Sequence, residues 1–138
     1  MKIMAGYHTG IESKTLQNEF FRQVLFTGKH TQLVLMALQP QEDIGMEVHH
    51  TVDQFFRIEA GEGKAIVDGQ EYELKDGVAL IVPAGSQHNI INTSPTASLK
   101  LYTLYSPPNH PDGTIHQTKT EAMASEEHEH NTAIPYLK

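Results

Sequence analysis

The chain of 138 residues has the length of one ordinary domain and is too short for two. It contains no cysteine, which excludes disulfides, thiolate metal sites and a cysteine nucleophile. The net charge is −7, from 10 Lys and Arg against 17 Asp and Glu, so the surface repels phosphate backbones and anionic lipids. We therefore expect no nucleic-acid or membrane partner. Because neither a signal peptide nor an apolar run of about 20 residues occurs, we expect a cytoplasmic protein.

The first 17 residues are polar and predict an N-terminal arm, either irregular or forming an extra strand. Residues 18–107 follow as the main body of the domain. Residues 108–138 form a C-terminal extension of the same single domain.

The main body consists of short apolar and β-branched runs separated by turn residues, a pattern typical of an all-β sandwich or barrel. The runs are Phe20–Phe26, Gln32–Leu38, Glu47–His49, Gln54–Ile58, Lys64–Val67, Gln70–Leu74, Val78–Val82, His88–Asn92 and Leu99–Tyr105. Between two of them, Asp68-Gly69 is the favoured two-residue hairpin signal, because a type I′ turn needs positive φ at both central positions.

The C-terminal extension begins with a Pro-rich loop and continues with Lys119–Glu129, which predicts one exposed acidic helix. The chain has nine histidines, and four of them lie in this extension. His110 and His116 fall in the loop, where a histidine is usually solvated, although functional loops also carry ligands and a role in the pocket stays open. His128 and His130 fall near the end of the chain, where we expect fraying and at most adventitious metal binding.

Residues 77–92, GVALIVPAGSQHNIIN, combine a strand, a rigid turn and a second strand. Pro83 and Gly85 predict the tight turn. His88, Ile90 and Asn92 then share one face of the second strand. A histidine that directly follows a rigid turn is held in a narrow range of positions, which suits a metal ligand.

Residues 44–63 carry further polar groups on inward positions. Glu47 and His49 are two apart on an extended chain, so both side chains point to the same face. On the next strand, Gln54 shares the inner face with Phe56 and Ile58. The same alternation turns His50 and Arg57 outward, which favours surface, ion-pair or interface roles for both.

These two stretches resemble the paired motifs of the cupin superfamily. The second motif, G-x5-P-x-G-x2-H-x3-N, matches at every fixed position. Its matching residues are Gly77, Pro83, Gly85, His88 and Asn92. The first motif, G-x5-H-x-H-x4-E-x6-G, matches in spacing, with His49 and Gly61 in place. Glu47 replaces its first histidine, Gln54 replaces its glutamate, and Gln41 replaces its opening glycine.

The resemblance implies a double-stranded β-helix, the jelly-roll or cupin barrel, with ligands pointing into its mouth. Carried over by position, the metal ligands are Glu47, His49, Gln54 and His88. Such a set of two imidazoles, one carboxylate and one amide suits a single divalent ion, Zn²⁺, Fe²⁺, Mn²⁺ or Ni²⁺. Cupin barrels commonly pair through their sheets, so the resemblance also implies a homodimer formed through the N-terminal strands.

Three functions remain open from the sequence. The first is an enzyme that uses the metal as a Lewis acid on a small polar substrate, such as a sugar or keto-acid isomerase. The ligand types, with Gln and Glu interchanged, resemble those of phosphomannose isomerases, which are also cupins. The second is an Fe²⁺-dependent dioxygenase, because two histidines and one carboxylate form a facial triad. The third is a non-enzymatic module that binds a small ligand.

Purely structural interpretations compete with these three functions. Glu47 and Gln54 are also compatible with a cupin that has lost its metal and keeps both as hydrogen-bonding groups in a polar cavity. Asn92 is expected to support a turn or line the pocket, and Phe56, Ile58, Tyr102 and Tyr105 to belong to the core. Since Arg57 faces outward, no residue is identified as an anchor for a substrate phosphate.

Overall fold

The computed structural model describes residues 5–131, with side chains as far as residue 126. Two helices, α1 (Ile11–Gln17) and α2 (Lys119–Asn131), flank a body of short strands. The strands are β1 (Arg22–Thr27), β2 (Gln32–Leu38), β3 (Glu47–Val48), β4 (Asp53–Ala60), β5 (Glu62–Val67), β6 (Gln70–Lys75), β7 (Ala79–Val82), β8 (Gln87–Asn92), β9 (Leu99–Ser106) and β10 (Ile115–His116).

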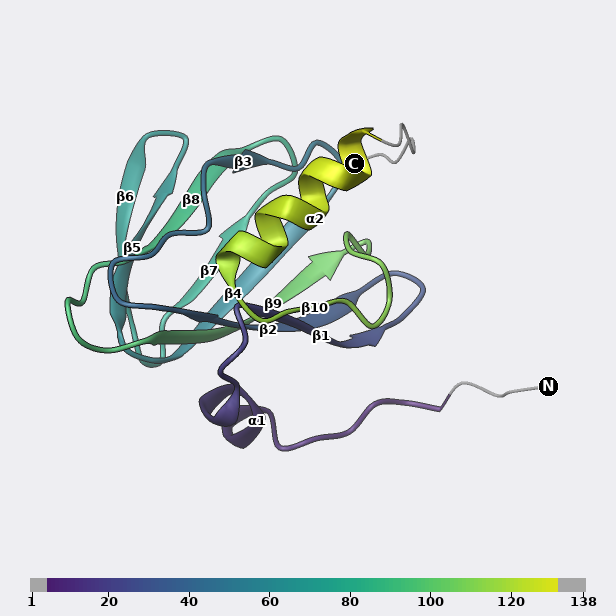
Figure 1. The fold of residues 1–138 in the computed structure, drawn as a ribbon, viewed down its shortest axis with the longest axis horizontal. Helices are drawn as coiled ribbons and strands as arrows, with labels where there is room; N and C mark the ends of the chain where they lie inside the picture. The colour runs from purple at the N-terminus through teal and green to yellow at the C-terminus, as the bar shows by residue number, and fades with distance from the viewer. Residues whose placement is uncertain (1–4, 132–138) are drawn as a thin grey trace.

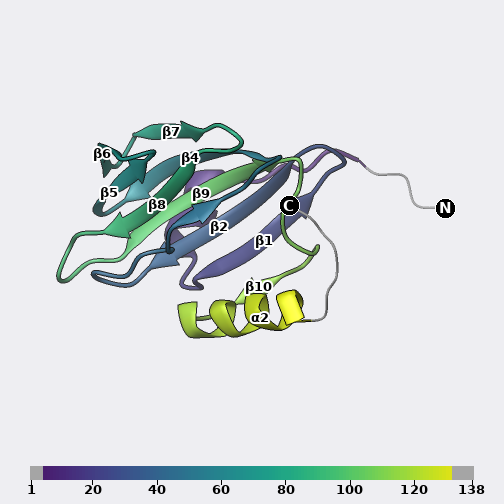
Figure 2. The same ribbon diagram turned by 90° about the horizontal axis from the view of Figure 1, so that it is seen from above.

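Within the described residues the strands form two facing antiparallel sheets (Figures 1 and 2). One sheet has six strands in the order β10-β1-β2-β9-β4-β7, and the other has four in the order β3-β8-β5-β6. Strands that are neighbours in space are often distant in sequence, as in β2 beside β9. This is the all-β jelly-roll architecture, and the predicted fold class is confirmed.

The core fills the space between the two sheets, because alternate residues of each strand point inward. On β2 the inward side chains Val34, Met36 and Leu38 are fully buried. They meet Ile90 from the opposite sheet and Leu101 from β9 in one apolar cluster. Phe56, Ile58 and Tyr105 are buried as expected, whereas Tyr102 is half-buried on the opposite face of its strand.

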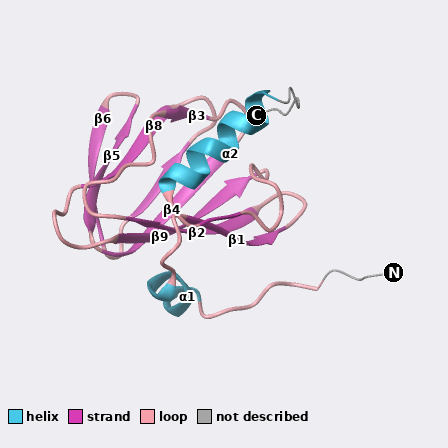
Figure 3. Ribbon diagram, in the orientation of Figure 1, coloured by secondary structure: helices cyan, strands magenta, loops and turns pink. Residues whose placement is uncertain are grey.

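Each of the nine predicted strands overlaps an observed one (Figure 3). The hairpin between β5 and β6 turns at Asp68 and Gly69, with φ of 48° and 83° as a type I′ turn requires. Strand β10 was not predicted, because two residues are too short to show an alternating pattern.

The irregular or strand conformation predicted for the N-terminal arm is wrong for residues 11–17, which form helix α1. This helix lies on the outer face of the six-stranded sheet against β4 and β9 (Figure 1). Thr15 is buried there, and its hydroxyl donates to the Ile11 carbonyl at 2.7 Å. A seven-residue helix gains its stability from such packing rather than from propensity, so the sequence alone gave little signal for it.

The C-terminal helix is present as predicted, but it is not simply exposed. It lies beside β10 (Figure 2), and its Ala122 is buried in the core cluster. Lys119 Nζ donates to Asp43 Oδ1 at 2.6 Å, and that contact, with a bond from Asn89, lowers the pKa of Asp43. The side chains of His128 and His130 lie outside the described residues. None of the described helices has the length and apolar character needed to span a membrane.

Two positions of the first motif show why glycine is favoured there. At Gly61, φ is +93°, and an added Cβ would lie 2.4 Å from the Ser98 carbonyl oxygen. Gln41, which replaces the opening glycine, also has a positive φ of 64°. It is the third residue of a four-residue turn in which Pro40 is the second. The turn is closed by a hydrogen bond from the Glu42 N–H to the Gln39 carbonyl. That combination is a type II turn, whose third position prefers glycine.

Replacing Gln41 with glycine should therefore stabilise the fold. We expect Gln41→Gly to raise the free energy of unfolding by about 0.5–1 kcal/mol, since the left-handed conformation costs a side-chain-bearing residue about that much. Thermal denaturation should show a rise of roughly 2–4 °C. The matched control is Gln39→Gly in the same turn. It should lower the free energy of unfolding, because the φ of Gln39 is not in the left-handed region and glycine gains nothing there. Equal destabilisation by both variants would contradict the assignment.

Candidate metal centre

The candidate centre is built on the pairing of the short strand β3 with β8. Their antiparallel register places Glu47 directly opposite His88. Residues opposite each other in such a pair have Cβ atoms about 4.5–5.5 Å apart, close enough for both side chains to reach one point. Because the two residues come from the two separate motifs, the fold brings the motifs together here.

His49 follows β3 and is fixed through its backbone. Its carbonyl accepts a hydrogen bond from the Gly85 N–H at 2.8 Å, which joins it to the turn before β8. That turn runs from Pro83 to Ser86, is closed by a bond between these two residues, and has Gly85 at φ +92°. The Ala84 N–H donates to Asp53 Oδ1 at 2.8 Å, which ties the turn to the start of β4 as well.

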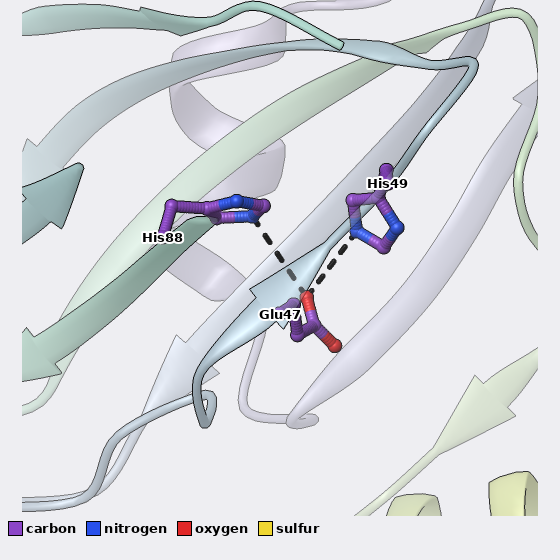
Figure 4. A group of neighbouring side chains, drawn as sticks. All are labelled: Glu47, His49 and His88. Atoms are coloured by element: carbon purple, nitrogen blue, oxygen red, sulfur yellow. Dashed lines mark ion pairs between the residues drawn. The ribbon is translucent and has the colours of Figure 1, made fainter. Parts of the chain in front are cut away.

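The three side chains converge on one point (Figure 4). Glu47 Oε1 lies 3.3 Å from His49 Nε2 and 3.9 Å from His88 Nε2. One potential ligand atom from each of these residues lies within 4.8 Å of the others. The structure thus brings together three of the four ligands that the sequence predicts.

The His88 ring has its coordinating nitrogen free. Its Nδ1 lies 3.2 Å from the Ser86 carbonyl oxygen. Because a carbonyl can only accept, Nδ1 carries the proton and Nε2 keeps its lone pair toward Glu47. A metal-ligating histidine is typically oriented in this way by a backbone carbonyl on its second nitrogen.

Gln54, the fourth predicted ligand, is buried on the inner face of β4. Its Nε2 donates to Thr103 Oγ1 at 3.0 Å, which fixes the amide plane. Its Oε1 is buried with no hydrogen-bond partner among the described residues. The register places Gln54 beside Tyr105, whose ring packs edge-on against His49 at a centroid distance of 6.0 Å.

Burial and neighbouring charges set the protonation of the centre. Burial raises the pKa of Glu47, but the His49 contact and the charge of Arg22 outweigh it and hold that pKa below its usual value. Burial lowers the pKa of His88, which keeps the imidazole neutral, although the Ser86 carbonyl opposes this. Burial raises the pKa of Tyr105 far above its usual range, so its hydroxyl keeps its proton.

The residues fit a metal ion because their donor atoms lack other partners. His49 Nε2, His88 Nε2 and Gln54 Oε1 are all buried, and none has a hydrogen-bond partner among the residues described. Leaving such atoms unpaired is costly, and a single cation can accept lone pairs from all of them at once. The anionic Glu47 supplies charge compensation. Ligation by these four residues stays a prediction.

Other positions behave largely as the alternation predicted. His50 is exposed, and Arg57 pairs outside the barrel with Glu59 at 3.7 Å. Asn92 supports the turn that follows β8, since its Nδ2 donates to the carbonyls of Leu38, Gln39 and Ala97.

Residues that the sequence did not single out also lie at the centre. Arg22 is 2% exposed inside the barrel, and its charge lowers the pKa of both Glu47 and Tyr105. The expectation of a solvated side chain is wrong for His116, which is buried, whereas His110 is half-buried. His110 Nε2 lies 3.2 Å from the Tyr105 hydroxyl, and His116 is buried with Nδ1 3.3 Å from Arg22 Nη1.

Comparisons with known proteins agree with this architecture. The family model described as "Cupin domain" matches residues 34–105. Two curated proteins with no assigned function are similar over most of the chain. YrkC of Bacillus subtilis is 50% identical over 85% of this chain and 66% of its own length, and L612 of Acanthamoeba polyphaga mimivirus is 42% identical over 86% of this chain and 76% of its own.

A solved structure gives the same result in three dimensions. The crystal structure of BH2720 from Bacillus halodurans superimposes with a TM-score of 0.85 at 43% sequence identity. The match covers 87% of this chain and 95% of that one.

The hydroxyl of Thr103 should matter for metal binding because it orients Gln54. We expect Thr103→Val to weaken divalent-metal affinity about 10-fold, as loss of an outer hydrogen bond to a ligand commonly does. Thr103→Ser keeps the hydroxyl and should retain most of the affinity. Competition titration with a chromophoric chelator measures both variants. Equal affinities for the valine variant and the unmodified protein would show that Gln54 is not a ligand in this orientation.

Proposed function

The chain belongs to the cupin domain family, and from this premise we propose that it is a metal-dependent enzyme acting on a small molecule. Glu47, His49, Gln54 and His88 would hold one divalent ion. One observation carries the proposal. Three buried donor atoms have no hydrogen-bond partner among the described residues, and the Glu47 carboxylate lies beside two of them.

The donor set limits the metal to borderline or hard divalent ions. Imidazole nitrogens with carboxylate and amide oxygens suit Zn²⁺, Fe²⁺, Mn²⁺ and Ni²⁺, whereas copper(I) prefers sulfur ligands. Four protein ligands leave positions open on an ion that accepts five or six. When bound, such an ion supplies a Lewis acid for a carbonyl or hydroxyl oxygen of the substrate. That chemistry suits the isomerisation of a sugar or a keto acid.

The residues around the ligands suit a bound polar substrate. The Tyr105 hydroxyl keeps its proton because of burial, so it can donate a hydrogen bond to a substrate oxygen. His110 Nε2 lies 3.2 Å from the same hydroxyl and can hydrogen-bond to it. We propose that the Tyr105 hydroxyl orients the substrate and that His110 fixes the direction in which this hydroxyl points.

A second function, an Fe²⁺-dependent dioxygenase, is favoured by one specific observation. Glu47, His49 and His88 form by themselves a compact group of two histidines and one carboxylate. That set is the facial triad of non-haem iron oxygenases. Anaerobic loading with Fe²⁺, followed by oxygen-uptake assays on aromatic and thiol substrates, separates the two functions. Tight Zn²⁺ binding without oxygen uptake favours the isomerase. Stabilisation by a ligand without any turnover would favour a binding module instead.

A homodimer formed through the N-terminal strands stays a prediction. Residue 7 stacks on β1, with the Tyr7 and Phe26 rings 5.3 Å apart, and Tyr7 remains 40% exposed. The N-terminal segment and β1 therefore share a partly exposed apolar surface on which a second copy of the chain would pack.

Metal analysis tests the proposal directly. Purified protein should hold about one divalent ion per chain after dialysis, and Glu47→Ala and His88→Ala should each lose most of it. Removing the ion should also lower the melting temperature, because an ion present at 100 times its dissociation constant stabilises by about 2.7 kcal/mol. The matched control is His50→Ala, adjacent to His49 but exposed, which should keep its metal. Substoichiometric metal that Glu47→Ala and His88→Ala leave unchanged would overturn the proposal.

A further inference from the structure

Arg22 is a buried cation beside the candidate metal centre. It starts strand β1, and its side chain is 2% exposed on the inner side of the barrel. Its guanidinium lies over the ring of Phe21, 5.3 Å from the centroid. In the register of β1 with β2, Arg22 lies opposite Met36, which is buried in the same inner cluster as Tyr105, so its side chain enters the barrel on the side of the centre. Its charge accordingly lowers the pKa of Glu47 and of Tyr105.

Not all hydrogen-bond donors of the Arg22 guanidinium are paired within the described residues. Nη1 donates to Glu126 Oε2 at 3.1 Å and lies 3.3 Å from His116 Nδ1. Nε is buried with no hydrogen-bond partner in the part of the chain that the structure describes. An arginine fork binds a carboxylate best through two parallel hydrogen bonds. The buried, charged Arg22 guanidinium makes only one short contact to a carboxylate. It therefore has N–H donors left for a second anion.

The group that pairs with Arg22 is the carboxylate of Glu126, which comes from a different secondary-structure element. Glu126 extends from helix α2, and its side chain is 34% exposed, in contrast to the buried arginine. Its charge also reaches the centre, where it raises the pKa of Tyr105. Helix α2 thus places an acid group between solvent and Arg22, on the guanidinium nitrogen that a carboxylate ligand would use.

We propose that Arg22 anchors the carboxylate of a small hydroxy- or keto-acid bound at the metal centre, and that Glu126 occupies this anchor when the acid is absent. The inference rests on the proposed function, and it narrows the substrate to a carboxylic acid. A phosphate is less suited, because Glu47 and Glu126 would repel its second negative charge. The sequence identified no anchor for a substrate phosphate, and it did not consider Arg22, which faces inward, as an anchor for a carboxylate.

The test compares acids with neutral partners of the same shape on protein loaded with Zn²⁺. Glucuronate with glucose, and lactate with lactamide, are the pairs, and calorimetric titration measures affinity. We expect the acid of at least one pair to bind 10-fold or more tightly than its neutral partner. Arg22→Met should abolish that preference while keeping bound Zn²⁺. Glu126→Ala should strengthen acid binding several-fold, because the competing carboxylate is gone.

The two variants should change the affinity for the acid in opposite directions. This distinguishes an anchor from a purely structural ion pair, because breaking a structural pair would weaken acid binding in both variants. Glu73→Ala, an exposed acid on β6, is the charge-matched control and should change nothing. If Arg22→Met fails to fold, the Glu126→Ala variant decides by itself. Equal binding of acid and neutral partners, or no gain in Glu126→Ala, would overturn the inference. Zn²⁺ content measured on the same samples separates this failure from that of the metal centre.

Discussion

The centre depends on one backbone constraint, the pairing of β3 with β8 together with the bond from the Gly85 N–H to the His49 carbonyl. Strand β3 is only two residues long, yet it sets Glu47 opposite His88. A slip of one residue would place Val48 there and turn the carboxylate away from the cavity. The rigid turn at Pro83–Ser86 prevents such a slip, because it is bonded at once to His49 and to Asp53.

Much of this could be predicted from the sequence because strands alternate. Once the runs around Glu47, Gln54 and His88 are taken as strands, the two-residue period fixes which side chains point inward, and the structure agrees at each of them. Even the departure at Gln41 is informative. Gln41 has a positive φ, a conformation that glycine adopts most readily, so the backbone at this position suits the glycine of the motif although the residue type differs.

The rest could not be predicted because it depends on tertiary packing. In the stretch FFRQVLF, apolar residues lie on both faces of the strand, so the pattern gives no reason to place Arg22 inward. Its burial becomes tolerable only when Glu126, over 100 positions later in the chain, supplies a counter-charge. His116 and helix α1 present the same difficulty, since short elements carry no periodic signal and owe their position to the surfaces they cover.

The charges around the candidate centre bear on the kind of ligand that the proposed ion would need. Glu47 and Glu126 are negative and Arg22 is positive, and ligating histidines are neutral, so the described groups leave one net negative charge. A divalent ion changes this to one net positive charge in a poorly solvated space, which is costly unless an anion accompanies it. A carboxylate bound at Arg22 would supply such an anion in place of Glu126. The buried Arg22 therefore connects the metal centre with the class of ligand that it would select.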